Sequence, residues 1–129
     1  MDRENIPDDV KRFILVHVPS IPYLEAMLLL RSESHRAWDG RQVARRLYMS
    51  EKAASELLLT LHAAEVVATT GPQSSSFRYQ PGSDHLRKMI DRLADAYSAS
   101  LVAVTNFVHS KTDKTAQHFA DAFRRRQGI

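Results

Sequence analysis

The side chains best suited to chemistry in this chain are its cations, which gather in two regions. The first lies within residues 31–50 and the second near the carboxyl end; their members are Arg31, Arg36, Arg41, Arg45 and Arg46, then Lys111, Lys114, Arg124, Arg125 and Arg126. Basic clusters attract phosphates because they release condensed counterions. Arginine and lysine also solvate helix surfaces without binding anything. Because the net charge is only +3, the placement of these cations carries more information than their number.

No pattern of catalytic residues competes with this basic signal. The chain has no cysteine, which removes disulfides, thiolate metal sites and cysteine nucleophiles. Its six histidines are scattered, and no pair has metal-ligand spacing. The four glycines form neither a phosphate-cradling loop nor a nucleophile elbow. We therefore expect no enzyme activity, no metal site and no cofactor.

Length and composition indicate one compact domain with a helical arm. The chain has 129 residues, of which 43% are hydrophobic, enough for a real core. Its first ten residues are charged where a signal peptide needs an apolar stretch, and no apolar run reaches membrane-spanning length. These features predict a cytoplasmic protein that does not enter a membrane.

Helix-start and helix-stop residues divide the first part of the chain. A helix is expected to begin at Pro7 and to end before Pro19, and Ser20 resembles the N-cap of a second helix that continues to about Glu33. Trp38 follows and is expected to pack between helices; a ligand-stacking role is the alternative.

Two helices separated by a tight turn are predicted between residues 40 and 65. Asp39 is a suitable cap for a short helix over residues 40–48, and Ser50 for a second helix over residues 51–65, with the turn at 49–50. The spacing of apolar residues predicts an inward face for each helix. These faces comprise Val43, Ala44 and Leu47 in the first helix and Ala54, Leu57, Leu58 and Leu61 in the second. Leu57 and Leu61 are expected to be buried against Val43 and Leu47.

A β-hairpin is predicted next. Residues 66–70 and 76–79 are rich in β-forming residues, and a Gly/Pro/Ser segment without any Lys or Arg connects them. Alternation along the second strand predicts that Phe77 and Tyr79 face the core and that Arg78 faces the solvent.

The remaining chain is predicted to be helical. One long helix is expected from Ser83–Asp84 to about His109, with an apolar stripe at spacings of three and four whose regularity fails between Tyr97 and Leu101. The stripe exceeds what one small core needs, so one side is expected to meet a second subunit. A short terminal helix is predicted over residues 114–126.

Together, these elements resemble a winged helix-turn-helix domain, and the whole chain resembles a MarR-like bacterial transcriptional regulator. The resemblance is carried by Val43–Ala44, Leu47, Ala54, Leu57–Leu58, Leu61 and Val66–Val67. It implies a mainly α fold with a two-stranded β-wing: residues 1–82 form the winged domain with its N-terminal helices, and residues 83–129 form a helical dimerisation arm.

The resemblance also implies a set of DNA-binding residues. The second helix would enter the major groove, while the first helix and the wing would lie along the backbone. The expected contacts are Arg41, Arg45, Arg46 and Arg78 to phosphates, and Ser50, Lys52, Ser55 and Glu56 at the groove. A glutamate can accept a hydrogen bond from a cytosine amino group.

Two functions remain open from the sequence. One is a homodimeric regulator that binds double-stranded DNA; the other is a winged-helix module that binds a protein and not DNA. An apolar patch beside the second helix would favour the protein-binding alternative, and a continuous basic surface would favour DNA. The sequence does not identify a target site or a small-molecule effector.

Overall fold

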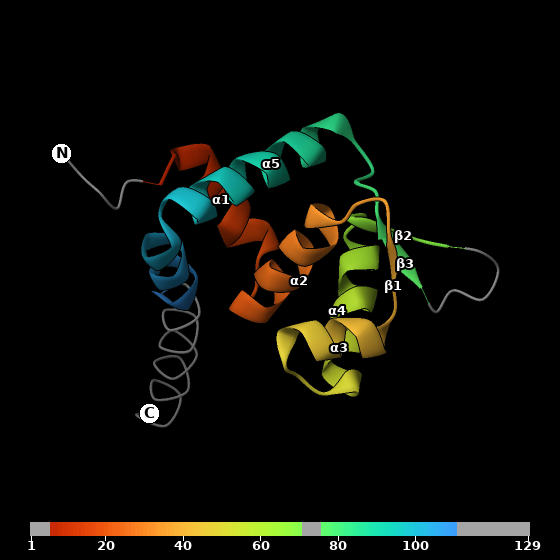
Figure 1. Ribbon diagram of the computed structural model, residues 1–129. Coiled ribbons are helices and arrows are strands. Elements are labelled where there is room, and N and C mark those ends of the chain that lie inside the picture. The colour runs from red at the N-terminus through yellow and green to blue at the C-terminus, as the bar shows by residue number, and fades with distance from the viewer. Residues whose placement is uncertain (1–5, 71–75, 111–129) are drawn as a thin grey trace, which may run out of the picture.

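The computed structural model describes residues 6–70 and 76–110 of the chain. Its elements are α1 (Asp8–His17), α2 (Ile21–Ser32), β1 (Ala37–Trp38), α3 (Gly40–Leu47), α4 (Glu51–Ala63), β2 (Val67–Thr69), β3 (Phe77–Tyr79) and α5 (Asp84–Ala99). A further helix, Leu101–Ser110, follows α5. The fold is therefore mainly α, as predicted, with a small antiparallel sheet at one side (Figure 1).

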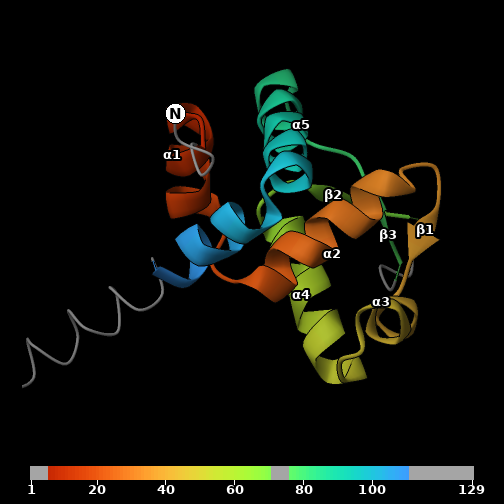
Figure 2. The same cartoon turned by 60° about the vertical axis from the view of Figure 1, so that its left-hand side comes forward.

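Helix α2 lies in the middle of the molecule and carries the centre of the core (Figures 1 and 2). Its Leu24, Met27 and Leu30 are completely buried. Helices α3, α4 and strand β3 pack on α2, while α1 packs on α5. Trp38 is also completely buried, and it lies in strand β1.

Side-chain caps begin four of the helices, because the first backbone N–H groups of a helix have no partner within it. In each case the cap accepts a hydrogen bond from the backbone three residues later: Ser20 from Tyr23, Asp39 from Gln42, Ser50 from Ala53 and Ser83 from Leu86. The Gln42 side chain also accepts from the Asp39 backbone N–H, which completes a capping box. The caps expected at Ser20, Asp39 and Ser50 are confirmed.

The sheet has three strands where the sequence predicted two. The hairpin of β2 and β3 is confirmed, with Val67 opposite Tyr79 and Thr69 opposite Phe77. Strand β1 pairs with the other edge of β3, which gives the order β1-β3-β2. The sequence did not indicate β1 because two residues are too few to show alternation. Its pairing depends on β3, about forty positions later along the chain.

The prediction of one continuous helix from residue 83 to about 109 is wrong. Helix α5 ends at Ala99, and the Leu101–Ser110 helix turns away from it in Figure 1. The break falls within the 97–101 interval where the apolar spacing is irregular. It brings Val104 and Val108 onto the core, where both are completely buried. Burial of these side chains favours the break, and the Ser100 carbonyl accepts a hydrogen bond from the Val104 N–H at the start of the second helix.

The inward face of α4 also differs slightly from the predicted one. Leu61 and Val43 are completely buried as expected, whereas Leu57 and Leu47 are only half-buried at the edge of the core. Leu58, which was also expected on the inward face, is buried. The predicted connecting segment of the wing at 71–75 and the predicted helix over 114–126 lie outside the described residues.

Candidate nucleic-acid interface

Helices α3 and α4 cross closely at one point near the start of α3. A Cβ atom at Gly40 would overlap the Ser55 hydroxyl, so a larger residue at this position would require the Ser55 side chain to move. Further along α3, Val43 and Ala44 are buried against the core. The crossing fixes the position of the first half of α4 relative to α3.

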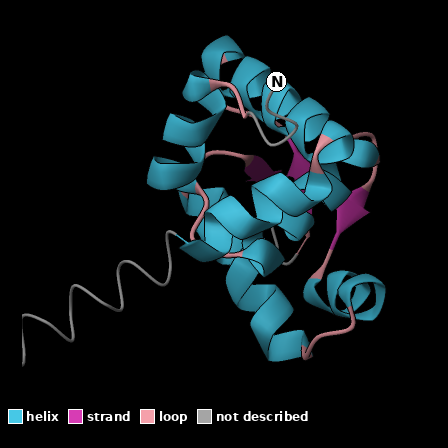
Figure 3. Ribbon diagram, turned by 90° about the vertical axis from the view of Figure 1, so that its left-hand side faces the viewer, coloured by secondary structure: helices cyan, strands magenta, loops and turns pink. Residues whose placement is uncertain are grey.

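The turn between α3 and α4 lies at an extremity of the molecule in the views of Figures 1 and 3. The side chains at the start of α4 are exposed there, namely Ser50, Glu51, Lys52, Ala53 and Glu56. Ser55 differs from them because it is half-buried beside Gly40. Of the residues expected at a groove, Ser50, Lys52 and Glu56 are therefore accessible, while Ser55 mainly packs the two helices together.

The arginines of α3 fall into two kinds. Arg41 and Arg45 are exposed and form no ion pair within residues 6–70 and 76–110. Arg46 is also exposed, but its Nη1 atom lies 3.1 Å from Glu33 Oε2. Glu33 thus reduces the positive charge that Arg46 presents to the solvent. Lys52 likewise forms no ion pair with another described residue, so three such cations border the start of α4, near the carboxylates of Glu51 and Glu56.

Glu33 belongs to a cluster at the end of α2 that links this helix to β1 and α3. Its Oε1 atom accepts from Arg36 Nη1 at 3.4 Å, and the Arg36 guanidinium lies over the Trp38 ring with its carbon 3.9 Å from the ring centroid. The Arg46 guanidinium carbon is 5.4 Å from the same centroid. We call Glu33, Arg36, Trp38 and Arg46 the tryptophan cluster. The stacking holds both guanidiniums beside Glu33.

Arg78 stands on the solvent face of the central strand β3, as predicted, between the buried Phe77 and Tyr79. Its neighbours on the two flanking strands are Ala37 and Ala68. Both are small, so the Arg78 side chain is not covered by a large neighbour across the sheet. Like Arg41 and Arg45, Arg78 forms no ion pair with any other described residue.

Tyr48 is a surface residue that the sequence patterns did not indicate. It follows α3 directly in the turn, its backbone is left-handed at φ 55°, and 95% of its surface is exposed. The apolar spacing predicts a first helix over residues 40–48 that includes Tyr48, and it predicts no role for this side chain. Its exposure follows from the turn geometry and not from any residue pattern.

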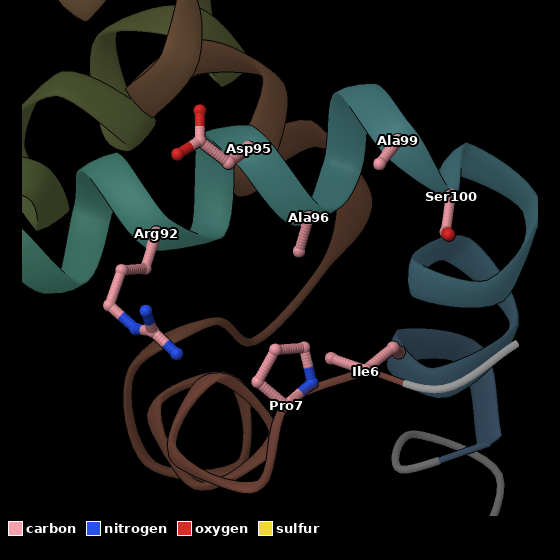
Figure 4. A pocket seen from close by; sticks show the side chains of 7 residues that line it. All are labelled: Ile6, Pro7, Arg92, Asp95, Ala96, Ala99 and Ser100. Carbon is pink, nitrogen blue, oxygen red and sulfur yellow. The ribbon is translucent and has the colours of Figure 1, made fainter.

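A hollow of about 260 Å³ lies away from this region, between the start of α1 and the end of α5 (Figure 4). Ile6, Pro7, Ala96 and Ala99 supply apolar lining, and Arg92 at its edge is bound to Asp9, with Nε to Oδ2 at 2.6 Å. The hydrogen bond from Arg92 lowers the pKa of the Asp9 carboxyl below its ordinary value. This ion pair joins α1 to α5. Because the Arg92 charge is paired with Asp9, it is not available to a ligand in the hollow.

The described part of the chain contains no group of three or more His, Asp or Glu side chains placed to hold a metal ion. It also contains no single helix that is long and apolar enough to cross a membrane; α1 and α2 reach that length only as a pair bent by 109°.

Comparisons of the chain with protein-family models, with curated proteins and with solved structures found no match. A function must therefore be inferred from the arrangement of the chain's own residues.

Proposed function

We propose that this chain is a winged helix-turn-helix protein that binds double-stranded DNA and regulates transcription as a homodimer in the cytoplasm. The element order supports the domain type: α3 and α4 form the helix-turn-helix, and β2 and β3 form the hairpin of the wing. Because a fold alone does not determine a function, the proposal depends on the surface around α4.

The observation that carries the proposal is the exposed start of α4, where polar side chains lie near cations that form no ion pair with another described residue. Lys52 and Glu56 lie on this part of α4, and Arg41 and Arg45 lie on the neighbouring α3. The N-terminal end of a helix also carries partial positive charge, which favours phosphate nearby. In this arrangement α4 enters the major groove, and α3 follows the backbone.

The distribution of exposed apolar side chains supports DNA over a protein partner at this surface. The large exposed hydrophobic side chains of the described residues are Leu15, Val16, Tyr48, Leu59, Leu101 and Val102. Only Tyr48 and Leu59 belong to the α3–α4 unit, and they are separated by most of α4. No apolar patch of the kind that marks a protein-binding surface is therefore formed at the start of α4.

The proposed dimer contact is the beginning of the Leu101–Ser110 helix. Most of the predicted apolar stripe is buried in the chain's own core, including Ile90, Leu93 and Val104. Leu101 and Val102 remain 54% and 63% exposed. They are adjacent on one helix and are the apolar side chains of the 83–109 region best placed to meet a second copy. A two-fold dimer would bind half-sites about 34–36 Å apart.

Equilibrium binding to mixed genomic duplex fragments over a series of salt concentrations tests the proposed function. The unaltered protein is expected to bind, with an affinity that falls as salt rises. Arg45→Ala should weaken binding to all sequences alike and reduce the salt slope by about one unit, because a phosphate contact carries no base information. Lys88→Ala is the matched control, since Lys88 is an exposed cation on α5, away from the proposed interface.

Sequence selection with the same fragments tests the role of α4. Lys52→Ala should change the preferred base at one position, by about 1–3 kcal/mol if the contact is direct. If the folded, unaltered protein does not bind duplex at low salt, the DNA proposal is rejected, and the protein-binding alternative becomes the better explanation of the fold.

A further inference from the structure

We propose that Tyr48 is an additional DNA contact: its hydroxyl donates a hydrogen bond to a backbone phosphate, and its ring lies against the adjoining deoxyribose. The inference rests on the proposed DNA-binding function and deepens it, because it assigns a contact to the turn between α3 and α4. Tyrosine hydroxyls are among the groups that bind phosphate oxygens in protein–DNA complexes.

The side chain of Tyr48 contributes little to the fold. It is 95% exposed, the highest value among the large exposed hydrophobic side chains of the described residues. Within that part of the chain its hydroxyl has no hydrogen-bond partner and its ring stacks on no other ring. Burial therefore gives no reason for a tyrosine at this position.

The backbone conformation at Tyr48 is also unfavourable for a tyrosine. Its φ and ψ of 55° and 52° are left-handed, a conformation that glycine adopts readily and that costs free energy for a residue with a Cβ atom. The turn is held there because the Ala44 carbonyl accepts from the N–H groups of both Tyr48 and Met49. Residues in costly conformations persist where the surrounding structure holds them, and they are frequent at functional sites.

The surroundings of Tyr48 fit a polyanion. It follows Arg45 by three residues and precedes Lys52 by four, and both cations are exposed without an ion pair among the described residues. An aromatic anchor for a protein partner is normally surrounded by other buried side chains of the interface. No other large apolar side chain is exposed on α3 or on the first half of α4 within the described chain, so the nucleic-acid contact is the better assignment.

Two substitutions separate stability from binding. Tyr48→Gly removes the side chain and relieves the left-handed backbone, so its melting temperature should equal or exceed that of the unaltered protein. Its affinity for mixed genomic duplexes should nevertheless fall about fivefold or more, the effect of losing one hydrogen bond of ordinary strength, and equally for all sequences. Tyr48→Phe keeps the ring and should lose a part of this affinity.

Glu65→Gly is the matched control for the backbone effect. Glu65 has a similar left-handed φ of 62° but lies beyond the opposite end of α4. This variant should gain stability without weaker binding. Binding of Tyr48→Gly at the affinity of the unaltered protein would overturn the Tyr48 assignment alone. If Tyr48→Phe binds as tightly as the unaltered protein, the proposed hydrogen bond from the Tyr48 hydroxyl is rejected. If the unaltered protein does not bind duplex, both the Tyr48 contact and the proposed function are rejected.

Discussion

The acidic side chain of Glu33 opposes the proposed function, because it neutralises a cation beside the proposed interface. Its two carboxylate oxygens contact Arg36 and Arg46, which also lie near the Trp38 ring. A phosphate brought to α3 must compete with Glu33 for Arg46. Arg46 is therefore expected to contribute less to DNA binding than the unpaired Arg45.

Substitution of Glu33 tests this competition. Glu33→Gln should strengthen duplex binding at low salt and steepen the salt dependence by about one unit, because Arg46 then interacts more fully with phosphate. The measurement is the same salt series. Glu25→Gln, which removes the same charge from an exposed position on α2, should have a smaller effect. Equal effects of the two variants would mean that only net charge matters and that the ion pair does not.

Leu57 and Leu61 lie one turn apart on α4, but their side chains are buried to different extents. Leu61 is completely buried and Leu57 is half-buried. Leu61→Ala should cost about 2–5 kcal/mol of the free energy of unfolding, the range for truncation of a buried leucine. Leu57→Ala should cost less, since it removes less buried surface. Denaturant unfolding measures both, and a larger loss for Leu57→Ala would contradict the orientation of α4.

At the scale of elements, the ion pair between Asp9 and Arg92 connects α1 to α5. Two hydrogen bonds join the guanidinium to the carboxylate, at 2.6 and 3.0 Å. The pKa of Asp9 is lower in the folded chain, mainly because of the hydrogen bond from Arg92. The pair therefore stabilises the fold above the ordinary aspartate pKa, and this contribution disappears as the pH falls through the lowered value.

The expected consequence is an acid-sensitive contact. Between neutral pH and a pH below about 4, the melting temperature of the unaltered protein should fall more than that of Asp9→Asn, which lacks the titrating group. Glu25→Gln is the control, because Glu25 is exposed on α2 and forms no ion pair with another described residue. The same acid response in Asp9→Asn and the unaltered protein would exclude this pair as its source.

At the scale of the whole molecule, the bend at Ser100 limits the surface that a second copy can use. Val104 and Val108 belong to the chain's own core, so an aspartate at either position should unfold the chain. Leu101 and Val102 are exposed and can be altered without that effect. They therefore allow the proposed dimer to be tested separately from folding.

The double variant Leu101→Asp/Val102→Asp should be a folded monomer, because charged side chains oppose burial at the proposed contact. Light scattering at tens of micromolar measures the mass, and circular dichroism measures the helix content. Leu15→Asp/Val16→Asp, at exposed apolar positions on α1, should leave the dimer intact. An unaltered protein that is already monomeric at this concentration would reject the homodimer.

The sequence by itself determined the features that depend on neighbours a few positions apart. The caps at Ser20, Asp39 and Ser50 are formed with residues three positions away, and the hairpin of β2 and β3 is formed across a short connection. Local hydrogen bonds of this kind leave a pattern in a short stretch of residues. The mainly α fold and the exposure of Arg78 could also be predicted, because helical spacing and strand alternation are patterns of nearby residues.

Only the tertiary structure decided the features that depend on distant partners. Strand β1 exists because β3 pairs with it, and the helix after Ser100 turns because Val104 and Val108 are more stable when buried. Within the candidate interface, the pairing of Arg46 with Glu33, thirteen residues away, likewise depends on how α2 and α3 pack. These interactions have no local pattern, because their energies arise from contacts that form only when separate elements come together.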